Sequence, residues 1–362
     1  MEFDLIRQYF EVPFASLAAL HGQSLRKGIG DDCAHLCVPE NHTLYVSSDS
    51  SVEAVHFFID DAASNIAAKA LISNLSDLAA CGAQPLGFSL NLTLPPRCLE
   101  PSWLEAFSSG LLRIASTHDC PLIGGDTTRG PCLVVSITVY GHAPQAHHGF
   151  HRSLAEEGQD LWVSGVPGLA RLGMLCAYRA RNRLAELCLL PDEYHNARQL
   201  LDGVNETIRA AALAAFESPV PRLELGVALR PFAGACLDLS DGLSGDLSHI
   251  SKQSGVALRL QSESLIASWQ NVLADGGSVH EDHLLALTLA GGDDYELCFT
   301  AAPGHRVSIA QLSQDLSLPL HLIGSVHEGA GVFLHKSEGQ VLPVYPTSYN
   351  HFDRTQDIAK PI

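Results

Sequence analysis

Asp238-Leu239-Ser240-Asp241-Gly242-Leu243 marks the point where a buried strand is expected to pass into a helix. The apolar residues 235–237 before it are typical of a buried strand, and Leu243, Leu247 and Ile250 follow helical spacing. Two carboxylates therefore stand at a helix N-terminus, where free N–H groups favour an anion. Because two carboxylates would themselves repel a phosphate, the arrangement predicts a divalent cation between the acids and the anion.

The same combination of glycine, hydroxyl and acidic residues recurs along the chain. It appears as Gly-Ile-Gly-Asp-Asp at 28–32, Ser-Ser-Asp at 47–49, Gly-Gly-Asp-Thr-Thr at 124–128 and Gly-Gly-Asp-Asp at 291–294. A single cluster of this kind is more often a turn or a helix cap. The repetition beside apolar segments instead predicts a shared site of oxygen ligands, which Mg²⁺ prefers.

Some acids fit this predicted metal site better than others. The aspartates assigned to it are Asp32, Asp49, Asp77, Asp126, Asp238 and Asp241. Asn74 and Asp77 lie three residues apart on a predicted helix over 62–81, so both side chains point to one side. Ser47 and Ser48 add hydroxyl oxygens to the set. Turn or capping roles explain three further acids at least as well: Asp31, Asp246 and Asp294.

Length and composition limit the classes of protein to which the chain can belong. Its 362 residues, 46% hydrophobic and 17% charged, are enough for two well-cored globular domains. A net charge of −18 argues against nucleic acid or an anionic membrane surface as the main partner. No apolar stretch has transmembrane length, and the ten cysteines include no C-x-x-C pair, so free thiols in a reducing cytoplasm are expected.

The order of strand and helix patterns predicts α/β domains in both halves of the chain. The strands that precede Asp49 and Asp126 are expected to end at these acids. Residues 142–158 lack clear periodicity and mark a domain boundary. The predicted divisions are an N-terminal domain over 1–145, a C-terminal domain over 152–345 and a tail over 346–362.

Several common enzyme motifs are absent from the sequence. It contains no G-x-x-x-x-G-K-[ST] loop, no protein-kinase catalytic loop and no G-x-S-x-G. The pair Gly28 and Gly30 does not complete a dinucleotide-binding fingerprint. Zinc is disfavoured because the clusters hold oxygen ligands and lack the His and Cys spacing of zinc sites.

Taken together, these segments resemble the thiamine-monophosphate kinase family. This family lies in the ATP-binding superfamily of aminoimidazole ribonucleotide synthetase, selenophosphate synthetase and the hydrogenase maturation protein that acts on carbamoyl groups. The superfamily features are the early acids and Asp-x-Ser-Asp-Gly at 238–242. The thiamine branch is indicated by Val-His-Phe at 55–57, Asn-Leu-Ser-Asp at 74–77, the segment 291–297 and Tyr-Asn-His-Phe at 349–352.

The resemblance implies a two-domain α/β fold like that of aminoimidazole ribonucleotide synthetase. In such a fold the N-terminal domain binds ATP and Mg²⁺, and its sheet pairs with its twin across a homodimer. The C-terminal α/β domain folds over the nucleotide, and the tail contributes to the substrate pocket. The implied activity is direct in-line phosphorylation of thiamine monophosphate by ATP, which gives thiamine diphosphate in the last step of its biosynthesis.

The resemblance also implies roles for individual residues. The implied ligands of several Mg²⁺ ions are Asp32, Ser47, Ser48, Asp49, Asp77, Asp126, Asp238 and Asp241. The implied nucleotide contacts are Gly125, Asp126, Arg152 and Ser240, and the implied thiamine-phosphate contacts are His56, Asp293 and Tyr349. The family pattern has Glu where this chain has Asp293, which is one methylene shorter. Without the resemblance, the residues favour a linker arginine at 152, a core histidine at 56 and tail packing at 349.

Three alternative functions remain open at the level of the sequence. The first is another ATP-dependent enzyme of the superfamily, although selenophosphate synthesis is disfavoured because no cysteine precedes Cys33. The second is a two-metal phosphohydrolase that uses the acids to activate water. The third is a non-catalytic thiamine-phosphate binding protein, which would bind its ligand equally well with or without Mg-ATP.

Overall fold

The computed structural model describes residues 2–146, 149–187, 191–274, 279–337 and 339–345. Helices and strands alternate along the chain, which confirms the predicted α/β class. The chain divides into two compact units, the first formed by Met1–Gly149 with Pro221–Pro231 and the second by Phe150–Val220 with Phe232–Ile362. Tyr349 and the predicted tail over 346–362 lie outside the described residues.

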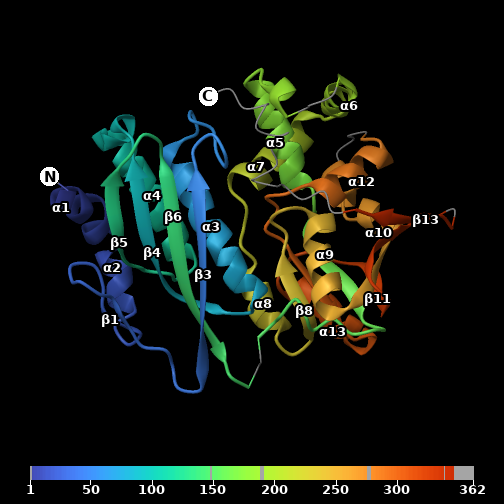
Figure 1. Cartoon of the computed structure of the whole chain (residues 1–362), viewed down its shortest axis with the longest axis horizontal. Helices are drawn as coiled ribbons and strands as arrows, with labels where there is room; N and C mark the ends of the chain where they lie inside the picture. Colours follow the sequence, from blue (N-terminus) through green and yellow to red (C-terminus); the bar gives the residue numbers. More distant parts are fainter. Residues whose placement is uncertain (1, 147–148, 188–190, 275–278, 338, 346–362) are drawn as a thin grey trace. The chain divides into compact units, whose positions relative to one another are not determined.

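The first unit is built on a four-stranded sheet in the order β3-β6-β4-β5. The strands are β3 (His42–Val52), β6 (Val134–Pro144), β4 (Gln84–Leu94) and β5 (Leu122–Arg129). β6 runs antiparallel to both of its neighbours, and β4 is parallel to β5. The helices α3 (Ala63–Ala80) and α4 (Pro101–Thr117) pack against each other and cover one face of the sheet (Figure 1).

The two faces of this sheet differ because successive residues of a strand point to opposite sides. Phe88 and its alternate neighbours along β4 are buried. On the opposite face the cross-strand pairs are hydroxyls, with 2.8 Å between Ser48 Oγ and Thr138 Oγ1 and 2.7 Å between Ser50 Oγ and Ser136 Oγ. The sheet therefore has one buried apolar face and one open face, on which these hydroxyl pairs lie beside the exposed Leu44 and Val46.

Two strands of this sheet are longer than the sequence analysis predicted. β3 continues past Asp49 to Val52, and β5 continues past Asp126 to Arg129. The expectation that these strands end at the acids is therefore wrong. The sheet accommodates both acids because β3 and β5 are its edge strands and both side chains are exposed to solvent.

Shorter elements complete the first unit. They are α1 (Glu2–Ile6), the π-helix η1 (Arg7–Glu11), α2 (Val12–Leu20), β1 (Leu25–Lys27), β2 (His35–Leu36), the 3-10 helix η2 (Pro96–Leu99) and α8 (Leu223–Leu229). α8 comes from a distant part of the chain and packs on α3. Arg230, just after α8, donates from Nε to the carbonyl of Gly82 at 2.8 Å. This bond helps to hold the Pro221–Pro231 segment on the first unit.

The second unit contains a seven-stranded sheet in the order β13-β12-β9-β11-β7-β10-β8. Its strands are β7 (Asp160–Ser164), β8 (Ala233–Asp238), β9 (Val256–Gln261), β10 (Leu297–Ala301), β11 (Leu320–Glu328), β12 (Gly331–His335) and β13 (Val341–Val344). Only the β12–β9 pair is parallel among these described strands. Leu237 of β8 and Leu258 of β9 are almost fully buried in one core with Leu247, as the sequence pattern predicts.

A second apolar cluster lies around Trp269, and the helices of this unit accompany the sheet. They are α5 (Leu169–Ala180), η3 (Leu184–Glu186), α6 (Pro191–Asp202), α7 (Glu206–Glu217), α9 (Leu243–Ser254), α10 (Ser262–Ala267), α11 (Gln270–Leu273), α12 (Glu281–Ala290), η4 (Pro303–His305) and α13 (Arg306–Asp315). Trp269 is fully buried, and its indole N–H donates to Thr288 Oγ1 at 2.9 Å. α9 begins at Leu243, where the sequence predicts it.

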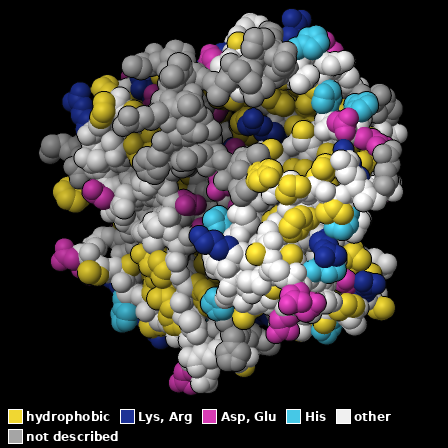
Figure 2. Space-filling view, turned by 45° about the vertical axis from the view of Figure 1, so that its right-hand side comes forward, with side chains coloured by type: hydrophobic (Ala, Val, Ile, Leu, Met, Phe, Trp, Pro, Cys, Tyr) yellow, Lys and Arg dark blue, Asp and Glu magenta, His cyan; other side chains and the backbone are white. Residues whose placement is uncertain are grey.

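Charged side chains are mixed on the surface. On the face shown in Figure 2, Lys and Arg side chains of the described residues lie singly among acidic, histidine and apolar side chains. No helix in the described ranges has both the length and the apolar character that spanning a membrane requires.

Gly110 provides a test of the packing between α3 and α4. A Cβ at this position would overlap backbone atoms of Ser64, which cannot move aside as a side chain would. We expect Gly110→Ala to lower the free energy of unfolding by about 1–3 kcal/mol, despite the better helix propensity of alanine. Urea unfolding measures the change. Gly22→Ala is the matched control, because its Cβ would meet only one backbone oxygen at 3.5 Å; equal stability of the two variants would contradict the prediction.

Candidate functional site

Three of the predicted ligands meet where α3 packs against β3. Ser47 Oγ donates to Asp77 Oδ2 at 2.5 Å, and the backbone N–H of Asp49 donates to Asn74 Oδ1 at 3.2 Å. Asn74 and Asp77 therefore both face β3, as their spacing on the helix predicts. Ser47 and Asp49 alternate with Ser48, which presents its hydroxyl to the open face of the sheet. The structure thus gathers hydroxyl and carboxylate oxygens on the α3 side of β3.

The two neighbouring acids after Gly30 differ in their surroundings. Asp31 accepts a hydrogen bond from the backbone N–H of Asp32 at 2.9 Å, and its Oδ2 lies 3.5 Å from Lys27 Nζ. Asp31 therefore has local partners, in line with the turn role considered for it. Asp32 is exposed, so its carboxylate can be reached by an ion from solvent.

Asp126 lies on the opposite edge and the opposite face of the sheet from Asp49. Its register partner is Asn91 on β4, which in turn lies beside Ser136 on the open face. Three strand spacings separate β5 from β3, which is roughly 14 Å. Gly125 precedes Asp126 where the backbone of β5 approaches β4 too closely for a side chain. One copy of the first unit therefore does not bring Asp126 to Asp49.

His56 lies in the turn after β3 and is exposed. Its Nδ1 accepts a hydrogen bond from the backbone N–H of Val52 at 3.0 Å. This bond assigns the acceptor role to Nδ1 and leaves Nε2 to carry the proton of the neutral ring. The core position that the residues alone favour for His56 is therefore wrong, because the turn holds the ring at the surface.

The Asp238–Leu243 stretch forms a loop in the second unit whose shape depends on Asp246. Asp246 is buried in the first turn of α9, and its Oδ2 accepts hydrogen bonds from the backbone N–H groups of Asp241 at 3.2 Å and Gly242 at 3.1 Å. Gly242 has φ +111°, a conformation that side chains rarely adopt. The capping role considered for Asp246 is therefore confirmed, and the loop presents Ser240 and Asp241 to solvent.

Electrostatics link Arg152 to the same loop. Burial, followed by the charge of Asp241, raises the pKa of Asp246 to about 7, while the positive charge of Arg152 acts in the opposite direction. Arg152 is exposed, and its backbone carbonyl accepts a hydrogen bond from Ser254 Oγ at 2.9 Å. The predicted nucleotide contacts Arg152 and Ser240 and the predicted ligand Asp241 therefore lie in one region of the second unit.

The segment before β10 carries two acids with different surroundings. Asp294 is buried and accepts hydrogen bonds from Gly168 N at 2.6 Å and Ala170 N at 3.1 Å, so it caps α5. Its burial raises its pKa well above the usual value. Asp293 is half-buried and accepts a hydrogen bond from the hydroxyl of Tyr295 at 3.2 Å. The capping role considered for Asp294 is confirmed, and the substrate contact predicted for Asp293 stays a prediction.

The donor chemistry of these groups fits magnesium. The predicted ligands are carboxylates and hydroxyls, which are hard oxygen donors. Among the described residues, however, no three or more His, Cys, Asp or Glu side chains are grouped so that they could hold a metal ion by themselves. Mg²⁺ is usually bound through one or two carboxylates together with substrate phosphates and waters. These residues therefore suit an ion that binds together with a phosphate.

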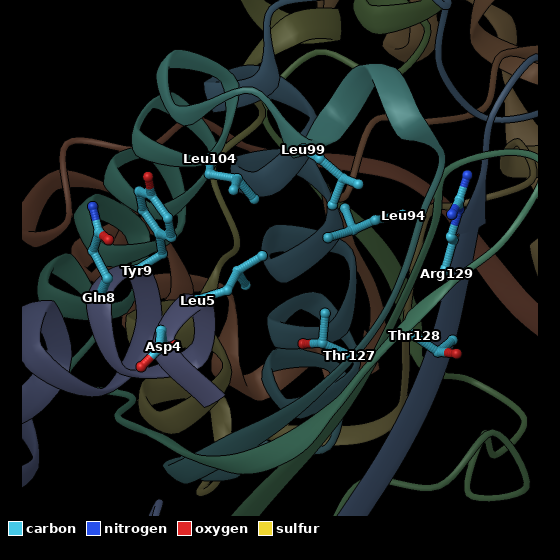
Figure 3. A pocket seen from close by; sticks show the side chains of 10 residues that line it. All are labelled: Asp4, Leu5, Gln8, Tyr9, Leu94, Leu99, Leu104, Thr127, Thr128 and Arg129. Atoms are coloured by element: carbon cyan, nitrogen blue, oxygen red, sulfur yellow. The ribbon is translucent and has the colours of Figure 1, made fainter. Parts of the chain in front are cut away.

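A separate cavity of about 690 Å³ lies in the first unit, between the N-terminal helices and the β4–β5 edge of the sheet. Its lining residues are Asp4, Leu5, Gln8, Tyr9, Leu94, Leu99, Leu104, Thr127, Thr128 and Arg129. Leu5 and Leu94 point toward each other across it, whereas Arg129 extends along the rim (Figure 3). None of the predicted site residues lines this cavity, so it is distinct from the groups described above.

Comparisons with known proteins give matches that extend over both units. Residues 30–143 match the family described as AIR synthase related protein, N-terminal domain. The thiamine-monophosphate kinase of Salmonella typhimurium is 37% identical over 353 residues, which are 97% of this chain and 98% of that protein. The crystal structure of thiamine-monophosphate kinase from Stenotrophomonas maltophilia K279a has a TM-score of 0.73 and 35% identity, covering 90% of this chain and 94% of that one. The structure of AaThiL complexed with AMPPCP and TMP has a TM-score of 0.67 and 26% identity, covering 94% and 98%.

The raised pKa of Asp246 predicts how stability depends on pH. Its carboxyl binds a proton more tightly in the folded chain, with a pKa of about 7, than at its ordinary value of 3.8. Between these values the folded state holds more protons, so its stability falls as pH rises, by up to about 4 kcal/mol. Asp246→Asn removes this titration while keeping an acceptor oxygen. We therefore expect the stability of the variant, relative to wild type, to increase from about pH 4 to about pH 8.

Urea unfolding without divalent cations, at a series of pH values, measures this difference. Asp315→Asn is the matched control, because Asp315 is exposed and bonded only to the side chain of Gln311 among the described residues. A stability difference between Asp246→Asn and wild type that stays constant over this pH range would show that the carboxyl does not titrate as expected.

Proposed function

The chain belongs to the thiamine-monophosphate kinase family, and from this premise we propose that it phosphorylates thiamine monophosphate with ATP to give thiamine diphosphate. The observation that carries the proposal is the match to the Salmonella typhimurium kinase, which spans nearly the full length of both chains. The likeness to AaThiL, whose structure contains AMPPCP and TMP, supports the same pair of substrates. The product would complete the biosynthesis of thiamine diphosphate.

We propose that several Mg²⁺ ions bind with the ATP phosphates. Their ligands would be Asp32, Ser47, Ser48, Asp49, Asp77, Asp126, Asp238 and Asp241. Magnesium would supply positive charge against the phosphate oxygens of both substrates. This charge is needed because the chain itself has a net charge of −18 and would otherwise repel two phosphorylated molecules.

The remaining predicted residues would bind the organic parts and phosphates of the substrates. Gly125, Asp126, Arg152 and Ser240 would contact the nucleotide, and His56, Asp293 and Tyr349 would contact thiamine monophosphate. A guanidinium such as that of Arg152 can form two parallel hydrogen bonds to a phosphate. A carboxylate such as that of Asp293 would favour the cationic thiazolium ring.

Transfer is proposed to be direct and in-line, without a phosphoenzyme. The acceptor is a phosphate oxygen, which is already ionised at neutral pH and needs no strong general base. The chain would therefore act by holding donor and acceptor in line and by placing charge around the transferred group. The exposed side chains of Ser240, Asp241 and Arg152 are suited to this because they can be reached by ligands from solvent.

We also propose that the enzyme works as a homodimer. The positions of Asp126 and Asp49, on opposite edges and faces of one sheet, support this proposal. If two copies pair through their sheets, the β5 edge of one copy can complete the ligand set at the β3 edge of the other. A second copy is thus a physical route by which the separated acids can serve one substrate.

The central prediction is that purified protein converts thiamine monophosphate and Mg-ATP into thiamine diphosphate. Chromatography of the products measures this conversion, and removal of divalent cations with a chelator should stop it. Phosphate release with no thiamine diphosphate would instead identify a phosphohydrolase. Pre-incubation with labelled ATP alone should leave the protein unlabelled; a stable phosphoprotein would rule out direct transfer.

Asp241→Asn tests the proposed ligand set. We expect turnover to fall by at least about 100-fold, because a metal ligand that acts on the transferred group contributes several kcal/mol to catalysis. The fold should be retained, since the backbone N–H of Asp241 still reaches Asp246. Asp315→Asn, an exposed acid in the same unit, should keep wild-type turnover. Activity of the Asp241 variant near the control level would remove Asp241 from the metal site.

A further inference from the structure

The segment before β10 is hydrogen-bonded along its length to the loop after β8. Asp293 N donates to Ser240 O at 2.9 Å, and Tyr295 N donates to Leu239 O at 2.8 Å. Leu239 N in turn donates to Glu296 O at 2.8 Å. The predicted nucleotide loop and the predicted substrate segment are therefore one bonded structure, and a displacement of one displaces the other.

Glycines allow the two stretches to come this close. A Cβ on Gly292 would lie 2.7 Å from Ser240 O, and a Cβ on Gly242 would lie 2.7 Å from Gly291 O. Both overlaps are with backbone oxygens, which cannot move aside without breaking the contacts between the stretches. The spacing between the nucleotide loop and the substrate segment is consequently fixed by backbone atoms on both sides.

Two residues of the segment adopt the left-handed backbone conformation. Asp293 has φ +66° and Tyr295 has φ +51°. Aspartate is found in this region more often than most residues, whereas a bulky aromatic residue is rarely found there. Such strain persists only where the surroundings hold the residue in place. Here the side chain of Tyr295 is buried, with 8% exposure, and its N–H is bonded to Leu239.

The residues around Tyr295 are anchored into the interior of the second unit. Asp294 caps α5 through Gly168 and Ala170, and Glu296 accepts a hydrogen bond from the hydroxyl of Ser164. Between these anchors the Tyr295 hydroxyl donates to Asp293 Oδ1 at 3.2 Å. A strained and buried aromatic residue thus directs a hydrogen bond to the carboxylate proposed to contact the substrate.

We propose that Tyr295 is a positioning residue for substrate recognition, which sets the direction of the Asp293 carboxylate toward the cationic ring of the phosphate acceptor. The inference rests on the proposed function and names the residue that orients its substrate contact. Because the segment is bonded to the Ser240 loop, the carboxylate is also held at a fixed distance from the nucleotide side of the site. Aspartate is also one of the residues that adopt the left-handed conformation of position 293 most readily.

Tyr295→Phe removes the hydroxyl and keeps the buried ring. We expect the KM for thiamine monophosphate to rise about five- to ten-fold, which corresponds to the typical net contribution of one hydrogen bond. The kcat and the KM for ATP should stay within about twofold of wild type, because the ring and the backbone bonds to the Ser240 loop remain. Tyr178→Phe, in α5 of the same unit, is the matched control and should leave all three constants unchanged.

A double-mutant cycle separates positioning from an independent effect. Asp293→Gly removes the carboxylate but keeps the left-handed backbone accessible. In this background Tyr295→Phe should produce no further rise in the KM for thiamine monophosphate. Two results would overturn the positioning role. One is a double variant in which the effects of the two substitutions on the KM for thiamine monophosphate multiply. The other is a Tyr295→Phe variant whose kcat and KM for ATP change as much as its KM for thiamine monophosphate. Loss of cooperative unfolding in Tyr295→Phe would also overturn the positioning role, because the hydroxyl would then act in folding.

Failure of this inference and failure of the proposed function give different results. If wild type makes no thiamine diphosphate, the proposed function fails and no KM comparison arises. If wild type is active and Tyr295→Phe has an unchanged KM for thiamine monophosphate, only the positioning role of Tyr295 fails.

Discussion

Repulsion between carboxylates is the constraint on which the site of this protein depends. Asp241 and Asp246 bring two negative charges to one loop, and burial together with this charge raises the pKa of Asp246 to about 7. Two backbone N–H groups and the charge of Arg152 partly offset the repulsion. A cation that approaches this loop from solvent would reduce the repulsion further, which supports the proposal that a metal–phosphate complex binds there.

The acidic side chains of the two units differ in position and exposure. In the first unit the proposed ligand acids lie on edge strands, on a helix that faces one of them and in the bend at Asp32, where solvent screens the exposed charges. In the second unit the acids are divided by role, because Asp246 and Asp294 are buried as caps while Asp241 remains exposed. The caps fix the backbone around the proposed ligands, of which Asp241 is exposed and Asp238 is buried.

The separation of Asp126 from Asp49 gives the proposed homodimer a chemical reason. The two edge strands of one sheet cannot approach each other, because the interstrand hydrogen bonds fix the distance between them. The face that carries the Ser48–Thr138 hydroxyl pair also exposes the apolar side chains of Leu44 and Val46 to solvent. Completing the ligand set with a second copy is therefore consistent with the geometry of a single first unit.

The sequence alone determined those features of this protein that depend on residues close together in the chain. Periodicity indicated the buried strand before Asp238, the helix from Leu243 and the shared side of Asn74 and Asp77, because each depends only on spacing along the chain. The recurring acids indicated oxygen-ligand chemistry for the same reason. Only the tertiary structure decided where β3 and β5 end, that the Pro221–Pro231 excursion packs with the first unit, and that the Tyr295 hydroxyl reaches Asp293. These features depend on strand register, on contacts between distant segments and on left-handed backbone angles, which no local pattern of residues specifies.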